Sequence, residues 1–298
     1  MYSLKDALTA LQYPGLIGTE LNKLYHRGLG GPGYNEAGID VFAEDWDVLV
    51  ILDACRYDIF AEVVGDDLGT RPLESRISRG SATREWVRAN FTDRTLNDLV
   101  YVDSNAHYGR LKSEIGAEVF KYTLVENDAF GGISVHPDRV TSAAIEAAET
   151  YPHKRLLVHY MQPHSPYFGP TAEHIEYKGF DMETVRHNDL DPETVRQCYV
   201  ENLEIALESV QRLVEEVTGR IVISADHGEM LGDRVAPIPV SYYGHPASVH
   251  IPELVKVPWL VHDTGQRRRI YESDPETDEV GLDNDEIDQK LRDLGYAV

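Results

Sequence analysis

The chain has 298 residues, of which 42% are hydrophobic, so it can bury a substantial core in one large α/β domain or two small ones. Its 28 basic and 51 acidic residues give a formal charge of −23, which argues against nucleic acid or an anionic membrane as a partner. The acidic surplus is spread along the whole chain and predicts a halophilic protein, with an ordinary acidic protein as the alternative.

The start of the chain lacks the basic and apolar pattern of a signal peptide. No apolar run reaches the length of about 18 residues that is typical of a transmembrane helix. The two cysteines, Cys55 and Cys198, do not make a disulfide framework, and they fit a reducing compartment. We therefore expect a cytoplasmic protein without a transmembrane segment.

Residues 1–45 are predicted to form a helical extension and a loop. Leucines at helical spacing on both sides of Pro14 indicate an amphipathic helix over residues 3–27, and the glycine-rich stretch 28–38 is predicted to be a loop. We expect the helix to pack on the main body. Binding to a partner or to a membrane surface is the alternative.

Residues 46–262 are predicted to form the main domain, in which apolar runs alternate with helical patterns. This alternation indicates an α/β protein with a largely parallel sheet. Buried strands are predicted over residues 46–53, 99–103, 155–161 and 220–225. A further strand or edge is expected over residues 122–128, and a last strand over residues 257–262, where Pro258 suggests an edge position.

Helices are predicted between these strands, over residues 57–64, up to Asn90, over residues 137–150, and from Pro192 onward. The polar stretch 170–191 is expected to be an irregular lid or rim that sets substrate choice. A proline-rich loop is expected after Glu229. Residues 263–298 are predicted to be an acidic linker with a terminal helix over residues 283–296.

Candidate metal ligands follow two of the predicted strands. Asp53 ends the strand 46–53, and Asp226 and His227 follow the strand 220–225. Ligands bind beyond the carboxyl ends of strands in open α/β sheets, and carboxylates with imidazoles suit a divalent metal. Gly228 is expected to let the backbone turn sharply, so that both side chains face one point. A strand-end turn with an aspartate cap is the alternative.

Two further histidines are held by glycine or proline. His164 follows the strand 155–161 between two prolines, and His245 lies between Gly244 and Pro246. A surface-loop histidine is the alternative for His164. His159 lies inside the strand, where we expect a core histidine whose hydrogen bonds are satisfied.

A hydroxyl near the start of the helix that ends at Asn90 is the candidate nucleophile. Either Thr83 or Ser81 could serve, because a hydroxyl at a helix N-terminus and beside a metal loses its proton more easily. Plain helix capping is the alternative. Arg56 could steady an anionic substrate or pair with Asp58. Cys55 is expected to be a small buried residue.

No Walker-type phosphate loop and no G-x-S-x-G elbow is present, which argues against a bound nucleotide cofactor and against an esterase. The chemistry expected instead is transfer of a phosphoryl, sulfuryl or similar group.

Several segments together resemble the alkaline phosphatase superfamily, and its sulfatase-like branch in particular. They are the strand to Asp53, Pro163-His-Ser-Pro166, Ser-Ala-Asp-His-Gly-Glu229 and the closing Leu291-Arg-Asp-Leu-Gly-Tyr296. The similarity runs in order from about residue 46 to residue 262. It implies a doubly wound, mostly parallel sheet with helices on both faces, and one or two divalent ions, which could be zinc, manganese, calcium or magnesium.

The resemblance also implies roles for the candidate residues. Asp53, Asp226 and His227 match metal-ligand positions. His164 matches a histidine that contacts the substrate's charged group or a second metal, and His245 falls where a second-metal ligand or an acid/base group is often found. The implied substrate is a small anionic ester, such as a glycan or lipid-headgroup precursor.

The sequence departs from sulfatases at the nucleophile segment. Sulfatases carry C/S-x-P-x-R, whereas this chain reads Ser81-Ala-Thr-Arg-Glu-Trp86, without the proline. Formylglycine is therefore not expected, and an unmodified Thr83 resembles the threonine nucleophile of phosphotransferases and phosphodiesterases. A catalytically inactive relative that binds an anionic glycan or a protein partner is the alternative function.

The halophilic interpretation predicts that the chain unfolds at a higher temperature in molar KCl than in dilute buffer, because salt screens the repulsion among its carboxylates. Circular dichroism during heating measures the midpoint at each salt concentration. A midpoint that stays constant or falls with added salt would identify an ordinary acidic protein.

Overall fold

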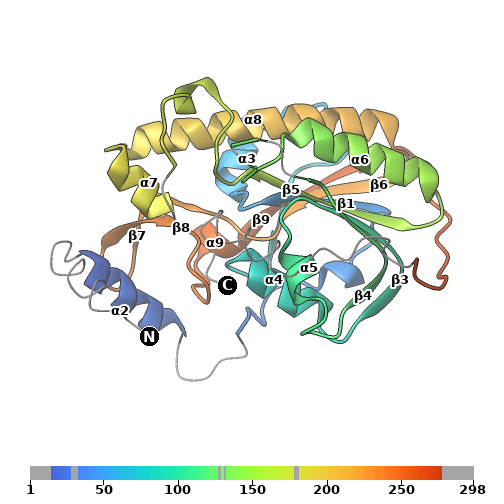
Figure 1. Ribbon diagram of the computed structural model, residues 1–298, viewed down its shortest axis with the longest axis horizontal. Coiled ribbons are helices and arrows are strands. Elements are labelled where there is room, and N and C mark those ends of the chain that lie inside the picture. Colours follow the sequence, from blue (N-terminus) through green and yellow to red (C-terminus); the bar gives the residue numbers. More distant parts are fainter. Residues whose placement is uncertain (1–14, 28–32, 127–128, 131, 178–180, 277–298) are drawn as a thin grey trace.

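A seven-stranded sheet forms the centre of the computed structural model, which describes residues 15–27, 33–126, 129–130, 132–177 and 181–276 (Figure 1). Five adjacent strands are parallel: β6 (Arg220–Ala225), β1 (Val48–Asp53), β5 (Arg155–Pro163), β3 (Thr95–Asp103) and β4 (Glu118–Leu124). β9 (Lys256–Asp263) pairs antiparallel with β6, and β2 (Glu74–Ile77) pairs antiparallel with β9. The predicted α/β class with a mostly parallel sheet is confirmed.

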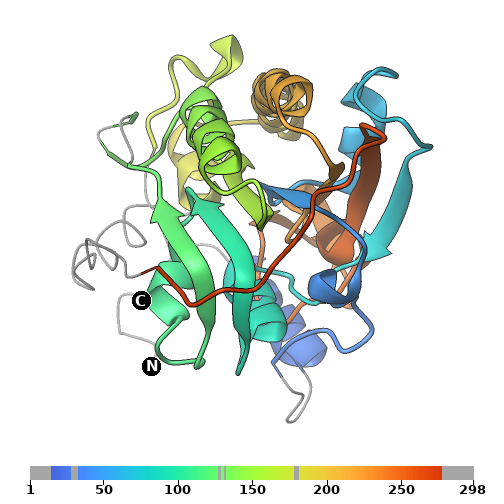
Figure 2. The same cartoon turned by 90° about the vertical axis from the view of Figure 1, so that its right-hand side faces the viewer.

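Helices cover both faces of the sheet, as expected for a doubly wound fold (Figures 1 and 2). One face carries α3 (Tyr57–Val63), α6 (Pro137–Thr150) and α8 (Pro192–Glu216). The other face carries α4 (Thr83–Phe91) and α5 (His107–Leu111). Short helical turns occur as η1 (Val41–Ala43), η2 (Pro170–Ala172) and α9 (Pro252–Val255).

β1 packs into two separate cores because its side chains alternate between the two faces of the sheet. Val50 and Leu52 belong to the core under α6 and α8, whereas Leu49 and Ile51 belong to the core that contains Trp86 of α4. All six residues of β1 are buried. This burial on both faces explains the unbroken apolar run of the strand and fixes the position of Asp53 at its end.

α8 is the longest described helix, and its bounds follow from its sequence. The Asp191 side chain accepts a hydrogen bond from the Thr194 N–H at 2.8 Å, and Pro192 occupies the first turn, where its missing N–H costs nothing. The buried residues recur at spacings of three and four, including Val195, Tyr199 and Leu203. One face of the helix therefore lies against the sheet.

The prediction of a loop after Glu229 is wrong for residues 230–244. This segment forms a two-stranded antiparallel hairpin of β7 (Met230–Val235) and β8 (Val240–Gly244). The edge strand β2 was also missed, because three of its four residues are polar, all four are half-buried or exposed, and it carries no apolar run. The expected irregular stretch 170–191 contains the helix α7 (Asp181–His187).

The expectation that Pro258 marks an edge strand is also wrong, because β9 lies between β6 and β2. Proline is tolerated there because the ladder to β6 ends one residue later in the chain, at the pair Trp259 and Ser224. On its other side, Pro258 lies opposite Ser75 of β2.

The N-terminal helix α2 (Gly15–Arg27) packs on the hairpin, as expected for a helix on the main body. The Asn22 amide donates hydrogen bonds to the carbonyl oxygens of Val235 and Ile238. Four apolar side chains of this helix are exposed, namely Ile17, Leu21, Leu24 and Tyr25. The predicted helical residues 3–14 and the terminal helix 283–296 lie outside the described residues.

After β9 the chain crosses the amino-terminal ends of the strands (Figure 2). Backbone hydrogen bonds join Thr264 to Gly219, Tyr271 to His153, and Ser273 to Asn97. This segment, the strap over residues 264–276, joins β6, β5 and β3 at the edge opposite their carboxyl ends. Among the described residues, no helix is long and apolar enough to cross a membrane.

Tyr199 of α8 joins the helix to the turn after Asp53, and its loss should destabilise the fold. Its buried hydroxyl donates to the Ala54 carbonyl at 2.7 Å and accepts from the Arg56 N–H at 2.9 Å. Tyr199→Phe leaves both buried groups unsatisfied and should lower the free energy of unfolding by about 1–3 kcal/mol. Urea denaturation measures this, with Tyr25→Phe on the exposed face of α2 as the matched control. Equal stability of both variants would contradict the assignment.

Candidate metal centre

Asp53, Asp226 and His227 meet at the carboxyl ends of β1 and β6, which are neighbours in the sheet. Each offers a ligand atom, and the three atoms lie within 4.8 Å of one another. The His227 Nε2 atom lies 3.5 Å from Asp53 Oδ1 and 3.3 Å from Asp226 Oδ2. All three residues are buried. The structure thus brings together three of the residues selected from the sequence.

The hydrogen bonds of this cluster leave its lone pairs pointing inward. The Nδ1 atom of His227 lies 2.8 Å from the Gly228 carbonyl, so Nδ1 carries the proton and Nε2 carries a lone pair. The Oδ1 atom of Asp226 accepts from the N–H groups of Ala54 and His227, whereas Oδ2 has no hydrogen-bond partner among the described residues. A buried carboxylate oxygen beside an imidazole lone pair calls for a positive charge between them.

Burial and like charge shape the protonation of the cluster. Burial, and then the nearby Asp226 carboxylate, raise the pKa of Asp53 well above its usual value. Burial, and then the neighbouring His245, lower the pKa of His227 well below its usual value, so this imidazole stays neutral. Two carboxylates and a neutral imidazole are a donor set that zinc, manganese and related ions accept. The residues present therefore fit a divalent metal.

Thr83 lies at the start of α4, directly beside the cluster. Its Oγ1 atom is 3.2 Å from His227 Nε2 and 3.4 Å from Asp53 Oδ1. The N-cap residue of α4 is Ala82, and no side chain caps the helix, so the Thr83 hydroxyl is not used for capping. A buried hydroxyl at a helix N-terminus, next to two candidate metal ligands, is placed for nucleophilic chemistry.

Ser81, the alternative nucleophile, has a different environment. Its hydroxyl lies 2.9 Å from Glu85 Oε2 and 3.1 Å from the Pro246 carbonyl, and it accepts from the Val249 N–H at 3.2 Å. The Glu85 carboxylate also accepts from the Ser81 N–H. These contacts tie the start of α4 to the loop after β8.

A second cluster, made of His164, Glu229 and His245, lies next to the first. Its ligand atoms also lie within 4.8 Å of one another. His245 Nδ1 is 3.2 Å from Glu229 Oε2, and His164 Nε2 is 4.0 Å from the same oxygen. The ring centroids of His227 and His245 are 4.5 Å apart, so the two clusters are in contact through these rings. This cluster could hold a second ion.

Arg56 is buried and engaged by protein groups. Its guanidinium pairs with both carboxylate oxygens of Asp58 and, at 2.7 Å, with Asp233 of β7. It also donates to the Glu229 carbonyl at 3.3 Å. The pairing with Asp58 that the sequence suggested is present, and Arg56 joins α3 to the chain that follows His227.

Gly228 is required for a reason other than the expected sharp turn. Its φ lies outside the left-handed region, and a Cβ atom there would lie 2.1 Å from the Glu253 carbonyl oxygen. Its N–H donates to the Leu254 carbonyl at 2.8 Å. The glycine therefore permits the close approach of the α9 segment to the chain directly after His227.

Sequence reasoning missed two polar residues of the site. The Asn105 amide, just after β3, donates a hydrogen bond to Asp53 Oδ2. The rule that selected Asp53, a polar residue beyond a parallel strand, applies equally to Asn105. Glu229 lies within the motif around Asp226, but its position beside His164 and His245 depends on how the chain folds after β6.

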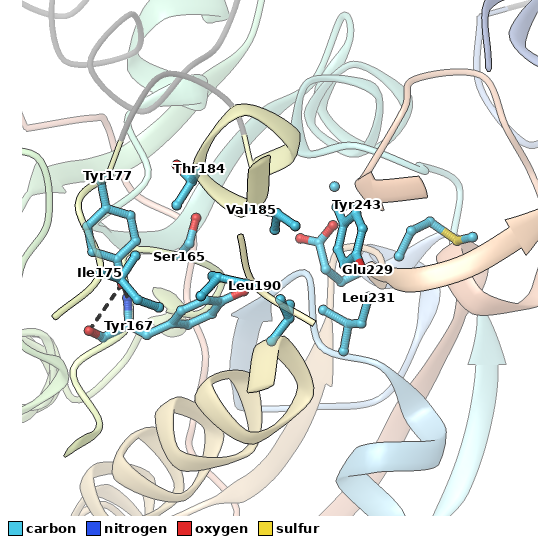
Figure 3. A pocket seen from close by; sticks show the side chains of 13 residues that line it. Ser165, Tyr167, Ile175, Tyr177, Thr184, Val185, Leu190, Glu229, Leu231 and Tyr243 are labelled. Atoms are coloured by element: carbon cyan, nitrogen blue, oxygen red, sulfur yellow. Dashed lines mark hydrogen bonds between the residues drawn. The ribbon is translucent and has the colours of Figure 1, made fainter. Parts of the chain in front are cut away.

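A pocket extends from Glu229 toward the segment that was expected to form a lid (Figure 3). Its wall is mostly apolar and aromatic, and it includes Tyr177 and Leu190 from that segment, Tyr167 from the chain just before it, and Tyr243 from β8. The Oε1 atom of Glu229 is buried and has no hydrogen-bond partner among the described residues. The pocket thus places apolar surface next to the second cluster.

No protein-family profile and no curated protein sequence matches this chain. Solved structures do match. The C-terminal periplasmic domain of phosphoethanolamine transferase EptC from Campylobacter jejuni is 13% identical, with a TM-score of 0.47 over 72% of this chain and 77% of that one. The soluble domain of lipooligosaccharide phosphoethanolamine transferase A from Neisseria meningitidis is 11% identical, with a TM-score of 0.44 over 72% and 75%.

A 2-O GAG sulfatase is 12% identical, with a TM-score of 0.42 over 76% of this chain and 65% of that one. By their names, these three neighbours are two phosphoethanolamine transferases and one sulfatase. Identities and TM-scores of this size carry no conclusion about activity, which has to come from the geometry of the metal centre.

Proposed function

We propose that this chain is a metal-dependent enzyme that cleaves or transfers a phosphate or sulfate ester, with the Thr83 hydroxyl as its nucleophile. The observation that carries this proposal is the meeting of Asp53, Asp226 and His227 around that hydroxyl, with their lone pairs facing one another in a buried site. The residue types and the hydroxyl are those that ester transfer at a divalent ion needs.

Asp53, Asp226 and His227 would hold the first ion, and His164, Glu229 and His245 would hold a second one. When bound, such an ion supplies positive charge that neutralises the carboxylates and polarises a phosphoryl or sulfuryl group. The candidate ions are zinc, manganese, calcium and magnesium, and activity measured with each of them identifies the ion.

Thr83 Oγ1 would attack the phosphorus or sulfur atom, and the bond from that atom to the ester alcohol would break. The hydroxyl proton has a neighbouring acceptor in Asp53 Oδ1 at 3.4 Å, whereas the single lone pair of His227 Nε2, at 3.2 Å, would be taken by the ion. His164 and His245 would contact the charged oxygens or the leaving alcohol. Water or another acceptor would then take the group from Thr83.

A panel of phosphate monoesters, phosphate diesters and sulfate esters, each with zinc, manganese, calcium or magnesium, tests the proposal. We expect turnover of at least one ester class, loss of activity with EDTA and recovery when the ion is restored. Asp226→Asn should bind less metal, because it replaces a charged ligand with a neutral amide, and should lose activity. Absence of both metal binding and turnover in the parent protein would favour an inactive binding protein instead.

The nucleophile is tested by Thr83→Ala and Ser81→Ala. Thr83→Ala should reduce turnover by on the order of a thousandfold or more and leave metal binding largely intact, because it removes the attacking oxygen. Ser81→Ala should keep turnover and lower stability by about 1–3 kcal/mol, because it leaves buried partners unsatisfied. Turnover that survives in Thr83→Ala and is lost in Ser81→Ala would reverse the assignment.

A further inference from the structure

His159 is a buried histidine in the middle of β5, one strand away from β6 and its metal-ligand candidates. It was expected to be a core residue with its hydrogen bonds satisfied, and the structure meets that expectation only at one nitrogen. Nδ1 lies 2.9 Å from the Tyr101 hydroxyl, whereas Nε2 has no hydrogen-bond partner among the described residues. A buried imidazole nitrogen without a partner is costly, and it calls for an explanation.

The unpartnered nitrogen faces another unpartnered atom. His159 Nε2 is 3.9 Å from Asp226 Oδ2, the carboxylate oxygen that points toward the candidate metal centre. The two side chains come from β5 and from the end of β6, on either side of β1. Both are fully buried, so water does not compete for either atom.

The aromatic rings around His159 hold its orientation. The Tyr101 ring is nearly parallel to the imidazole, with centroids 6.4 Å apart and an interplanar angle of 10°, and its hydroxyl contacts Nδ1. Trp86 meets the imidazole edge-on at 5.7 Å. The hydrogen bond and the Trp86 contact therefore restrict rotation of the imidazole. Nε2 keeps its direction toward Asp226.

The Tyr101 hydroxyl selects the tautomer. If it donates to Nδ1, the ring proton sits on Nε2 and points toward the Asp226 carboxylate. If it accepted from Nδ1, a lone pair on Nε2 would face the negatively charged oxygen, which is repulsive. Burial raises the pKa of Tyr101 well above its usual value, so its hydroxyl keeps the proton that it donates. Electrostatics thus favour the Nε2–H form.

We propose that His159 is a positioning residue for the metal centre, in which its Nε2–H directs Asp226 Oδ2 and Tyr101 fixes the tautomer that makes this possible. The inference rests on the proposed function, because it assumes that Asp226 is a metal ligand. Outer partners of this kind orient the ligand and typically change metal affinity by about 10- to 100-fold when they are removed.

Two substitutions separate the two sides of the imidazole. His159→Gln has an amide that reaches the position of Nε2 and keeps a donor toward Asp226. His159→Asn is shorter, keeps a polar group only on the Tyr101 side, and leaves Asp226 without the donor. His174→Asn, at an exposed position, is the matched control for the same chemical change.

The readout is the affinity of the EDTA-treated full chain for zinc and manganese, measured by isothermal titration calorimetry at fixed pH, together with the thermal midpoint before metal is added. We expect about 10- to 100-fold weaker binding in His159→Asn, affinity close to the parent in His159→Gln, and no change in His174→Asn. Tyr101→Phe, which preserves the aromatic packing, should also weaken binding, and it provides the test if His159→Asn does not fold.

The outcomes distinguish this inference from the proposed function. If both His159→Asn and Tyr101→Phe bind zinc and manganese with the parent's affinity, even with a lowered thermal midpoint, His159 only packs in the core. The proposed metal centre would not be affected by that result. Stronger loss in His159→Gln than in His159→Asn would overturn the assignment of Nε2 as the donor. A parent protein that binds neither ion would overturn the proposed function and this inference with it.

Discussion

The structure depends on one electrostatic constraint, which is that three electron-rich atoms converge in a buried space. His227 commits its ring proton to the Gly228 carbonyl, so its other nitrogen presents a lone pair to Asp53 and Asp226. Such an arrangement is stable only if positive charge enters it, as a proton on a carboxylate or as a metal ion. The raised pKa of Asp53, caused by its burial and then by the nearby Asp226 carboxylate, reflects this constraint.

Backbone N–H groups and a side-chain amide from a neighbouring strand end hold the two carboxylates in place. The N–H groups of Ala54 and His227 hold one oxygen of Asp226, and the Asn105 amide holds one oxygen of Asp53. Ala54 has a φ of 60°, an unfavourable value for alanine, at the turn that brings its N–H to Asp226. The strap over residues 264–276 binds the opposite edge of the sheet, so it stabilises the strands without occupying the site.

The hydroxyls of Ser81 and Thr83 are only two residues apart, yet they have different environments at the start of α4. The Ser81 hydroxyl is taken up by Glu85 and by the loop near Pro246, which fixes where α4 begins. The Thr83 hydroxyl is left to face Asp53 and His227. Because Ala82 is the N-cap, the helix needs neither hydroxyl for conventional capping. The local sequence alone could not distinguish these two environments.

The parallel strands and the polar residues at their ends can be predicted from the amino-acid sequence. Runs buried on both faces, such as β1 and β6, are apolar throughout, and the rule that ligands gather beyond parallel strands selected Asp53, Asp226 and His227. These features can be predicted because each depends on residues that are adjacent in the sequence. The same rule, applied after β3, would also have selected Asn105.

The remaining features depend on contacts between segments that are distant in the chain. β2 is short and mostly polar, and the strands of the hairpin β7–β8 mix apolar and polar residues without a regular alternation. The inner position of Pro258 depends on where the ladder to β6 ends. The roles suggested for Glu229 and His159 come from single atoms left without partners once distant segments pack. Hydrogen-bond satisfaction is a property of contacts between segments, and hydrophobic periodicity along one segment cannot report it.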